Sequence, residues 1–244
     1  MPRFFVDKNN IEEKRILIDG ADAHHIARSL RMAEGDEAIV CDGEGSEYRC
    51  TLVRIRDEEC ECEIIEALDS GAESPVSITL CMAYPKGDKL ETVIQKAVEL
   101  GCDRIIPFES SRCIKRPKAE KAEKQTARLQ RIAEEAAKQC GRARIPTVGA
   151  PISFKQMLAE TQKCDLSLLC YENEDGKTIK DALKNAGKVK SISIIVGAEG
   201  GFSTDEVMEA TNANCLSVSL GNRILRCETA PLFALAAISY ELEI

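Results

Sequence analysis

The sequence is poor in aromatic residues and in long apolar runs. It has no tryptophan, 6 phenylalanines and 4 tyrosines, so the stacking of nucleic-acid bases on aromatic rings is a minor resource here. No run of about 18 apolar residues occurs, which argues against a membrane-spanning helix. The opening residues, Met1 to Lys8, lack the apolar core of a signal peptide. We therefore expect a soluble cytoplasmic protein that does not bind membranes.

Histidine is also scarce, whereas cysteine is not. The 2 histidines, His24 and His25, are adjacent, and the 12 cysteines include no C-x-x-C pair, so the spacing does not fit a structural zinc site. Cys81, Cys170 and Cys215 stand singly in or beside apolar runs, which is typical of small buried side chains. We predict no metal centre and no disulfide framework.

The net charge of −8 disfavours nucleic-acid binding when the chain is taken as a whole. The segment before position 73 is strongly acidic, but from Ser110 to Arg144 basic residues clearly outnumber the four acidic ones. The basic residues of this segment are Arg112, Lys115, Arg116, Lys118, Lys121, Lys124, Arg128, Arg131, Lys138, Arg142 and Arg144. Such an excess can supply phosphate contacts, and the alternative is an ordinary solvated helix face.

Residues 1–72 hold short apolar stretches between turn signals. Glu37–Gly43 and Tyr48–Ile55 are predicted strands joined at a glycine-containing turn, and Asp22–Met32 is a predicted short helix. Several short strands with one helix favour a small β-barrel. The small, polar segment Asp69–Pro75 is the predicted linker.

After Pro75 strands alternate with helices, which predicts an α/β domain with a mostly parallel sheet over residues 73–244. The expected strands are Val76–Met82, Asp103–Phe108, Asp165–Tyr171, Ser191–Val196 and Cys215–Leu220. The expected helices are Lys86–Leu100, Ala119–Gln139, Ser153–Thr161, Lys177–Ala186, Thr204–Ala213 and Glu228–Leu242.

The most informative stretch runs from Ser191 to Glu206. A β-rich run ends at Gly197, a glycine-rich turn follows, and Ser203 and Glu206 have the spacing of a capping box that starts a helix. In open α/β sheets the ligand crevice lies past the carboxyl ends of the strands, where this turn falls.

The glycines of this turn have two interpretations. Gly197, Gly200 and Gly201 permit positive φ and a close approach of the backbone to a ligand, or they satisfy the geometry of a tight turn alone. The turn is neither a G-x-G-x-x-G fingerprint nor a lysine-bearing phosphate loop. Glu199 would suit a cationic or hydroxyl-bearing ligand better than a triphosphate.

A second stretch, Ser217–Ala230, ends a strand at Leu220 and leads through a compact loop into an apolar helix. Its two arginines, Arg223 and Arg226, would lie beside the glycine turn if the two strands were neighbours. The alternative for each arginine is a surface ion pair.

Together the two stretches closely resemble the paired signatures of the SPOUT methyltransferase superfamily. They read VGAEGGFS at Val196–Ser203 and LGNRILRCETA at Leu220–Ala230. Within the superfamily they are similar to the family that methylates uridine N3 in 16S ribosomal RNA. The similarity covers essentially the whole chain and includes MPRFFV at the start, HHIARSLR, KAVELG and EAAKQCGRARIP.

The chain departs from that family's pattern at three positions. The family usually has proline where Ala198 stands, commonly proline at Asn222, and usually threonine at Cys227. The first two changes loosen the turn backbones, so we expect weaker cofactor binding than is usual in the family.

The resemblance implies a PUA-like β-barrel over residues 1–72 that binds RNA, and a SPOUT domain over 73–244 with a trefoil knot. It also implies a homodimer and S-adenosyl-L-methionine as cofactor. The implied partner is 16S ribosomal RNA or the small ribosomal subunit, and the implied acceptor is N3 of one specific uridine (uridine 1498 in the family). Carried over position by position, the implied cofactor contacts are Leu169, Gly197, Glu199, Gly200, Leu220, Ile224, Leu225 and Arg226.

Methyl transfer to nitrogen is an in-line displacement in which the protein aligns donor and acceptor. Uridine N3 must lose its proton, and a cation near O2 or O4 would stabilise the resulting anion. Arg226 is the first catalytic candidate for that role, with a pairing role only as the alternative. Glu199 would accept the proton if burial raised its pKa, and water is the alternative acceptor.

RNA contacts are expected from both domains. The candidates are Arg3, Arg28 and Arg31 in the first domain and Lys86, Arg112, Arg128, Arg142 and Arg144 in the second. Two alternative functions stay open: a SPOUT enzyme with another acceptor such as a ribose 2′-hydroxyl, and a non-catalytic ribosome-assembly protein. A nucleotide-utilising α/β enzyme is disfavoured because the phosphate-loop lysine and the NAD fingerprint are missing.

Overall fold

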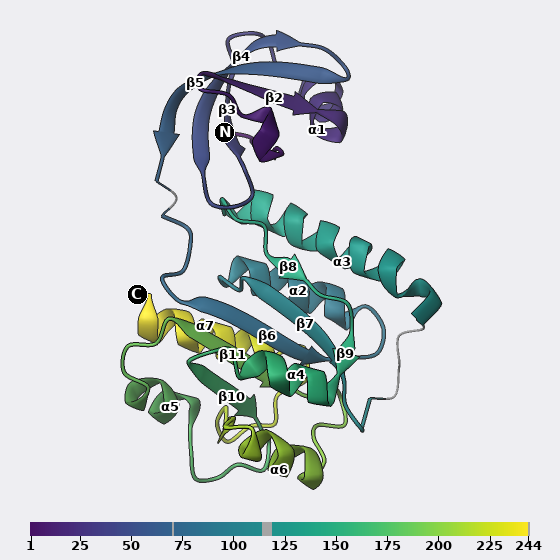
Figure 1. The fold of residues 1–244 in the computed structure, drawn as a ribbon, viewed down its shortest axis with the longest axis vertical. Helices are drawn as coiled ribbons and strands as arrows, with labels where there is room; N and C mark the ends of the chain where they lie inside the picture. The colour runs from purple at the N-terminus through teal and green to yellow at the C-terminus, as the bar shows by residue number, and fades with distance from the viewer. Residues whose placement is uncertain (70, 114–118, 244) are drawn as a thin grey trace. The chain divides into compact units, whose positions relative to one another are not determined.

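Residues 1–69, 71–113 and 119–243 are described by a computed structural model, in which the chain divides into two units (Figure 1). Unit 1 comprises Met1–Glu73 together with Ala137–Ile145, and unit 2 comprises Ser74–Ala136 together with Pro146–Ile244. Lys115, Arg116 and Lys118 of the basic segment lie outside the described residues, as does the side chain of Lys121.

Unit 1 is built on a five-stranded sheet with the order β1-β3-β4-β5-β2. The strands are β1 (Arg3–Phe5), β2 (Arg15–Asp19), β3 (Glu37–Cys41), β4 (Glu47–Ile55) and β5 (Glu59–Leu68). Strand β1 pairs in parallel with β3 and the other pairs are antiparallel. The sheet curls into a half-barrel (Figure 1), so the expected barrel is confirmed as an open form.

Side-chain alternation explains why this sheet has one buried face. In β5, Cys60 and Cys62 are fully buried and alternate with glutamates that face outward. The predicted helix is observed as α1 (Gly20–His24) followed by a π-helical turn, η2 (His25–Leu30), which bury Ala23 and Ile26 in the same core. A short 3-10 helix, η1 (Lys8–Asn10), follows β1.

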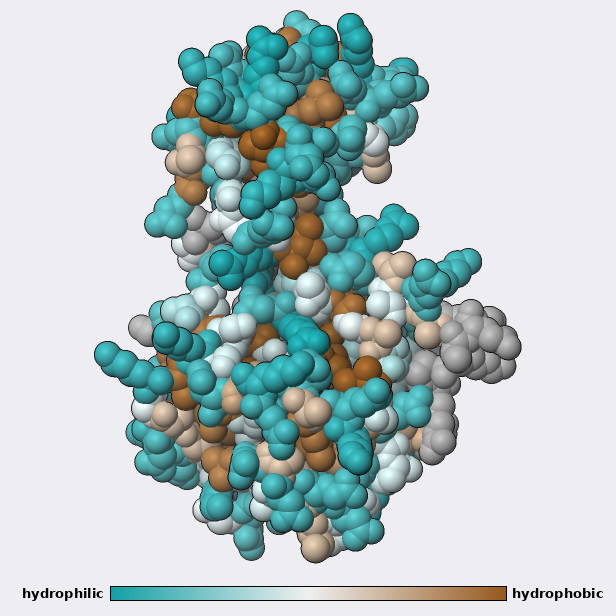
Figure 2. Space-filling view, in the orientation of Figure 1, coloured by the Kyte–Doolittle hydropathy of each residue, from teal (hydrophilic) through white to brown (hydrophobic). Residues whose placement is uncertain are grey.

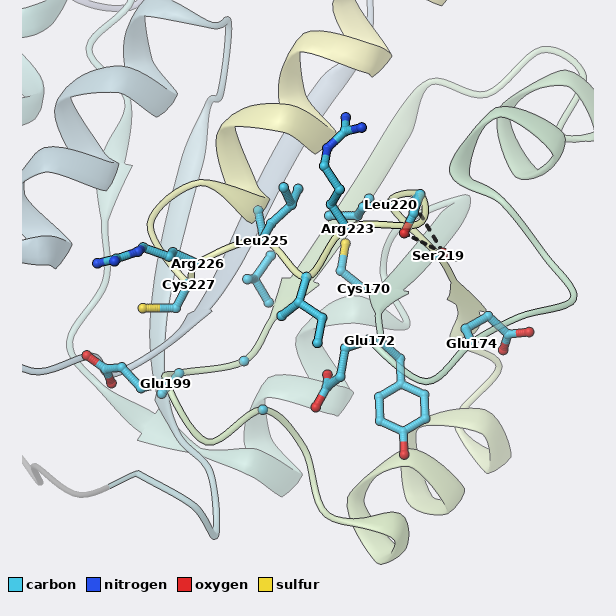
Figure 3. Close-up of a pocket in the computed structure, with 18 of the residues that line it drawn as sticks. Cys170, Glu172, Glu174, Glu199, Ser219, Leu220, Arg223, Leu225, Arg226 and Cys227 are labelled. Carbon is cyan, nitrogen blue, oxygen red and sulfur yellow. Dashed lines mark hydrogen bonds between the residues drawn. The ribbon is translucent and has the colours of Figure 1, made fainter.

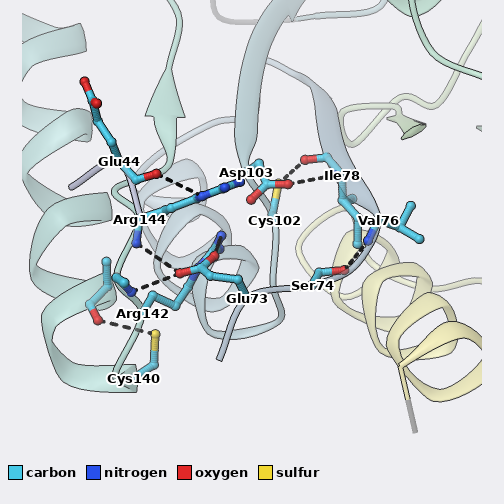
Figure 4. Close-up of polar contacts among 12 residues, drawn as sticks. Glu44, Glu73, Ser74, Val76, Ile78, Cys102, Asp103, Cys140, Arg142 and Arg144 are labelled. Atoms are coloured by element: carbon cyan, nitrogen blue, oxygen red, sulfur yellow. Dashed lines mark hydrogen bonds and ion pairs between the residues drawn. The ribbon is translucent and has the colours of Figure 1, made fainter. Parts of the chain in front are cut away.

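The segment 137–145 joins unit 1 through polar contacts (Figure 4). The Glu73 carboxylate accepts hydrogen bonds from the Arg142 side chain at 2.7 and 3.1 Å, and from the backbone N–H groups of Ala143 and Arg144 at 2.9 and 3.0 Å. The Arg144 side chain also donates to the Glu44 carbonyl at 3.1 Å. The structure therefore places Arg142 and Arg144 in unit 1, not in the second domain as expected.

Unit 2 is an α/β domain whose strands all run parallel, as predicted. Its sheet has the order β12-β10-β11-β6-β7-β8, with β9 also paired to β7. The strands are β6 (Ser77–Ala83), β7 (Arg104–Glu109), β8 (Thr147–Val148), β9 (Ile152–Ser153), β10 (Leu166–Cys170), β11 (Ser191–Val196) and β12 (Leu216–Val218). The two-residue strands β8 and β9 had no counterpart among the predicted strands.

In the described part of this unit, five helices connect these strands and a sixth follows the last one, each close to its predicted range. They are α2 (Lys89–Glu99), α3 (Ala119–Cys140), α4 (Phe154–Thr161), α5 (Ile179–Asn185), α6 (Thr204–Asn212) and α7 (Ala230–Leu242). Helix α7 contacts α2, α5 and β11, whereas α4 packs against β7 and α6 against β12. Figure 1 shows α7 behind the sheet and α4 in front of it, so the sheet is covered on both faces.

The surface visible in Figure 2 is mostly hydrophilic, with apolar residues in small groups. Among the described residues, no helix is both long and apolar enough to cross a membrane.

Candidate active site

A cavity of about 870 Å³ opens at the carboxyl ends of β10, β11 and β12 (Figure 3). Three segments form its walls: the residues that follow β10, the glycine turn after β11, and the loop from Ser219 to Glu228 after β12. Parallel strands bring their carboxyl ends to one edge of the sheet, which is where α/β proteins place ligands. Both stretches singled out in the sequence therefore meet in one cavity of a size typical for small-molecule sites.

Tight packing explains the glycines of the turn. The Gly201 N–H donates to the Ala198 carbonyl at 3.0 Å, and Gly201 has a φ of +62°. A Cβ atom at Gly197 would lie 3.0 Å from the Cα of Gly201, and one at Gly200 would lie 3.0 Å from the Cβ of Arg112. The glycines thus satisfy the geometry of the turn, and the same turn also lines the cavity.

Strand β10 lies between β11 and β12, so the strands that carry the two signature stretches are not neighbours. Beyond the strand ends, backbone hydrogen bonds connect the segments that follow β10 and β12. Ser219 N–H donates to the Lys177 carbonyl at 2.7 Å, and Ile179 N–H donates to the Ser219 carbonyl at 3.1 Å. These bonds fasten the loop after β10 to the loop after β12, which places Arg223 and Arg226 at the cavity.

The structure brings together all but one of the predicted cofactor residues. Those that line the cavity are Gly197, Glu199, Gly200, Leu220, Ile224, Leu225 and Arg226. Leu169 is fully buried within β10 and is not among the lining residues, whereas Cys170, the next residue, is. The strand alternates its side chains between two faces, so a one-residue difference decides which of the two reaches the cavity.

Glu199 does not meet the condition set for a proton acceptor. Its carboxylate accepts hydrogen bonds from Lys89 Nζ at 2.9 Å and from the Lys86 N–H at 3.2 Å. Burial alone would raise the pKa of Glu199, but these bonds outweigh it and hold the pKa below its usual value. A carboxylate with a lowered pKa is a weaker base, so the condition that burial raises the pKa of Glu199 is not met.

Arg226 and Arg223 are both exposed, and neither side chain has a hydrogen-bond or ion-pair partner among the residues that the structure describes. In Figure 3 the two guanidinium groups point toward different ends of the cavity, with Arg226 on the side of Glu199 and Cys227. The surface ion pair considered for each arginine is therefore absent from the described part of the chain. A guanidinium without a counter-charge is available to an anionic ligand.

Five charged residues of the cavity were not predicted as site residues: Lys89, Glu172, Glu174, Asp175 and Glu228. Lys89 and Glu172 matter most for the argument. Lys89 begins α2 and lines the cavity. Glu172 follows β10, and its carboxylate lies so close to Gly201 that a Cβ there would be 2.3 Å from Oε1. Glu172 has no polar partner among the described residues. The only signal for either was its position near the carboxyl end of a predicted strand.

The RNA-contact candidates fall into two groups. Lys86 and Arg112 are exposed near the glycine turn, where Arg112 Nη1 donates to the Gly200 carbonyl at 3.0 Å. Arg128 forms an exposed ion pair with Glu91.

In unit 1 the candidates differ in their accessibility. Arg28 and Arg31 are exposed, although Arg28 pairs with Asp57. Arg3 has a largely buried side chain paired with Glu47. Arg142, at 2% exposure, is buried against Glu73, so its role in this structure is to hold unit 1 together. Arg144 remains exposed.

The cysteines behave as buried apolar side chains. Ten of the twelve are buried, Cys140 and Cys164 are partly buried, and none forms a disulfide. Burial raises the pKa of the Cys170 thiol to about 12, which keeps it protonated at the cavity wall. Within the part of the chain that is described, no group of three or more His, Cys, Asp or Glu side chains is placed to hold a metal ion.

Comparison with known proteins agrees with this architecture. The sequence profile of an RNA methyltransferase domain matches residues 72–239, and that of an RNA methyltransferase PUA domain matches residues 18–65. The parallel α/β unit with its cavity at the strand ends, preceded by the half-barrel, is thus the fold of an RNA methyltransferase.

Individual relatives identify the family to which the chain belongs among RNA methyltransferases. The chain is 38% identical to ribosomal RNA small subunit methyltransferase E of Bacillus subtilis, over 100% of this chain and 98% of that protein. It is 34% identical to the protein of the same name from Synechocystis, over 99% of this chain and 78% of the relative. The chain belongs to the ribosomal RNA small subunit methyltransferase E family, which confirms the resemblance found in the sequence.

A solved structure of a family member shows a bound ligand. The crystal structure of ribosomal RNA small subunit methyltransferase E from Neisseria gonorrhoeae is bound to S-adenosyl methionine. It superposes with a TM-score of 0.87 at 31% identity, covering 98% of this chain and 97% of that one.

Proposed function

We propose that this protein transfers a methyl group from S-adenosyl-L-methionine to N3 of one specific uridine in the 16S ribosomal RNA of the small ribosomal subunit. The observation that carries the proposal is the cavity in which both signature stretches meet and Arg226 has no counter-charge among the described residues. The family of the chain and the S-adenosyl methionine bound by its Neisseria gonorrhoeae relative support the choice of cofactor.

The residues of the cavity suit this cofactor. Leu220, Leu225 and Cys170 supply apolar wall for the adenosine part, and the glycine turn offers backbone groups at close range. The unpaired carboxylate of Glu172 suits a ligand with positive charge. When bound, S-adenosyl-L-methionine supplies an activated methyl group. Of the predicted contacts we keep Gly197, Gly200, Leu220, Ile224 and Leu225 and replace Leu169 by Cys170. Arg226 is assigned to the acceptor instead, and Glu199 to its ion pair with Lys89.

Arg226 has the central role toward the acceptor. An exposed guanidinium at the cavity rim would donate hydrogen bonds to a uracil carbonyl oxygen and stabilise the negative charge that develops when N3 loses its proton. Water accepts that proton, because Glu199 is engaged with Lys89. Exposed Lys86 and Arg112 beside the turn, with Arg128, Arg28, Arg31 and Arg144, are the proposed phosphate contacts.

The homodimer and the trefoil knot belong to the same proposal. Ile224 at the cavity and Phe233 and Tyr240 on α7 are large apolar side chains with 87%, 41% and 72% exposure. Phe233 and Tyr240 are seven residues apart, which puts them on one face of the helix. An exposed apolar face on a helix whose opposite face is buried in unit 2 favours a second copy of the chain as its partner.

The proposal is tested by methyl transfer from labelled S-adenosyl-L-methionine to small ribosomal subunits that lack the modification, followed by mass spectrometry of the digested nucleosides. We expect N3-methyluridine from a single site. A 2′-O-methylated nucleoside would show another acceptor. No transfer together with no cofactor binding by calorimetry would leave a non-catalytic RNA-binding protein.

Substitution of Arg226 separates its two possible roles. We expect Arg226→Ala to lower kcat about 100-fold, because the developing negative charge loses its donor, while the Kd for the cofactor changes little. Arg223→Ala, at the other end of the cavity, is the matched control and should keep most of the kcat. A large rise in the cofactor Kd without loss of kcat at saturation would instead make Arg226 a cofactor contact.

A further inference from the structure

Lys89 joins the two signature loops at one end of the cavity. Its ammonium lies 2.9 Å from Glu199 Oε1, on the glycine turn, and 3.4 Å from Glu228 Oε2, on the loop that precedes α7. The same ammonium lies 3.7 Å from Cys227 Sγ, which in turn lies 3.2 Å from Glu228 Oε2. One side chain from the start of α2 thus holds together segments that are far apart in the sequence.

The cluster carries more negative than positive charge. Hydrogen bonds from its own backbone N–H, Cys227 and Lys89 hold the pKa of Glu228 below its usual value, and the pKa of Glu199 is lowered as well. Two ionised carboxylates therefore share one ammonium. Burial and the neighbouring Glu228 raise the pKa of Cys227 to about 11, so the thiol stays neutral and adds no further charge.

Arg226 is the other cation at this end of the cavity. It is the residue next to Cys227, and Figure 3 shows its side chain on the same side as Glu199. Two carboxylates in this small region would be natural partners for a guanidinium. Arg226 nevertheless has no ion pair among the described residues, while Lys89 is bonded to both carboxylates.

We propose that Lys89 is a positioning residue that occupies Glu199 and Glu228, so that the Arg226 guanidinium remains free for the uracil. Lys89 also fixes the glycine turn against the Cys227–Glu228 segment. It does not touch the reacting atoms and acts through Arg226. This inference rests on the proposed function, because it assigns Lys89 a role in the chemistry proposed for Arg226.

The decisive comparison is between loss of Lys89 and loss of the whole charged cluster. In Lys89→Met the two carboxylates lose their ammonium and capture Arg226, so we expect kcat to fall at least about tenfold. In the triple variant Lys89→Met, Glu199→Gln, Glu228→Gln no carboxylate remains to capture it, so kcat should recover to within a few-fold of the wild type. Lys89→Arg, which keeps the positive charge, should also retain most of the kcat.

A purely structural role predicts the opposite order. If Lys89 served only to hold the loops together, the triple variant, which lacks every ion pair of the cluster, would have a kcat as low as that of Lys89→Met or lower. That result would overturn the inference, as would a Lys89→Met variant with the kcat of the wild type. If Lys89→Met does not fold, the triple variant and Lys89→Arg are compared with the wild type instead. A low kcat in both variants, when both are well folded, contradicts the proposal.

Lys96→Met is the matched control, because Lys96 lies on the same helix and pairs with Glu99 away from the cavity. Its kcat should equal that of the wild type. Wild-type activity in the same assay keeps the two hypotheses apart. An inactive wild type refutes the proposed function, whereas an active wild type with the wrong order of variants refutes only the role of Lys89.

Discussion

A methyl group added at Gly201 would meet the carboxylate of Glu172 at 2.3 Å, in a backbone conformation with φ of +62° that disfavours side chains. We expect Gly201→Ala to weaken cofactor binding at least about tenfold, because the added methyl group displaces the Glu172 carboxylate, which we propose faces the cationic cofactor, and strains the positive φ of the turn. Isothermal titration calorimetry with S-adenosyl-L-methionine measures the effect.

Gly187 provides the matched control at the same scale. It has a similar φ of +67° but nothing within 4 Å of an added Cβ, and it lies outside the cavity lining. Gly187→Ala should therefore lose about 1 kcal/mol of stability for its backbone conformation and leave the Kd unchanged. Equal Kd values for the two variants would show that the contact with Glu172 does not shape the cavity.

The elements that form the cavity begin and end where local chemistry places them. Helix α6 starts at a complete capping box: Ser203 Oγ accepts from the Glu206 N–H at 3.2 Å, and the Glu206 carboxylate accepts from the Ser203 N–H at 2.9 Å. The same carboxylate also accepts from Ser111 N–H and Oγ at 2.7 and 2.9 Å. Glu206 thereby connects the start of α6 to the loop after β7.

Glu206 forms more hydrogen bonds than Ser203. We therefore expect the two substitutions to lower the free energy of unfolding by different amounts. Ser203→Ala should lower the free energy of unfolding by about 1 kcal/mol, the usual effect of a lost N-cap. Glu206→Ala should cost about 2–3 kcal/mol, because it also removes the two charge-assisted hydrogen bonds from the Ser111 N–H and hydroxyl. Urea denaturation gives both values, and Ser153→Ala in the exposed capping box of α4 serves as the control. A smaller loss for Glu206→Ala than for Ser203→Ala would contradict this account.

At the scale of the whole molecule, Glu73 holds a distant segment of the chain in unit 1. Burial would raise its pKa, but hydrogen bonds from Arg142 and from the N–H groups of residues 143 and 144 outweigh burial and lower it. A carboxyl group whose pKa is lowered on folding adds stability above its unfolded pKa, and this stability is lost as the pH falls through the folded value. We expect Glu73→Ala to cost about 3 kcal/mol at neutral pH, because the buried Arg142 guanidinium loses both hydrogen bonds of this ion pair.

The pH dependence of the free energy of unfolding tests whether the charge of Glu73 is the source of this stability. The stability difference between the wild type and Glu73→Gln should be largest at neutral pH and should shrink below about pH 4.5, where the unfolded carboxyl group becomes protonated. Chemical denaturation at several pH values measures it. A difference that does not change with pH would attribute the effect to packing instead of charge.

The proposed homodimer is also a property of the whole molecule. Phe233→Glu places a charge within the exposed apolar face of α7, so we expect it to convert a dimer into a monomer in analytical ultracentrifugation. Met208→Glu on α6, where the methionine is 60% exposed, is the control and should leave the mass unchanged. A wild type that sediments as a monomer would contradict the proposed partner.

The sequence alone determined what depends on local pattern. Periodicity identified the parallel α/β domain, strand β11 to the residue, and the capping box of α6, because these depend on side chains a few positions apart. The paired motifs identified the family and two of the three segments that line the cavity, but not the residues after β10 or Lys89. The two-residue strands β8 and β9 escaped because so short a run has no period.

Only the tertiary structure decided how distant charges pair. That Glu199 pairs with Lys89, that Arg142 is buried against Glu73, and that Arg226 is left unpaired among the described residues depend on segments that are tens of residues apart. Whether Leu169 or Cys170 reaches the cavity depends on which face of β10 is covered. Pairing and burial set the pKa and the availability of each group, so residue type alone could not assign its role.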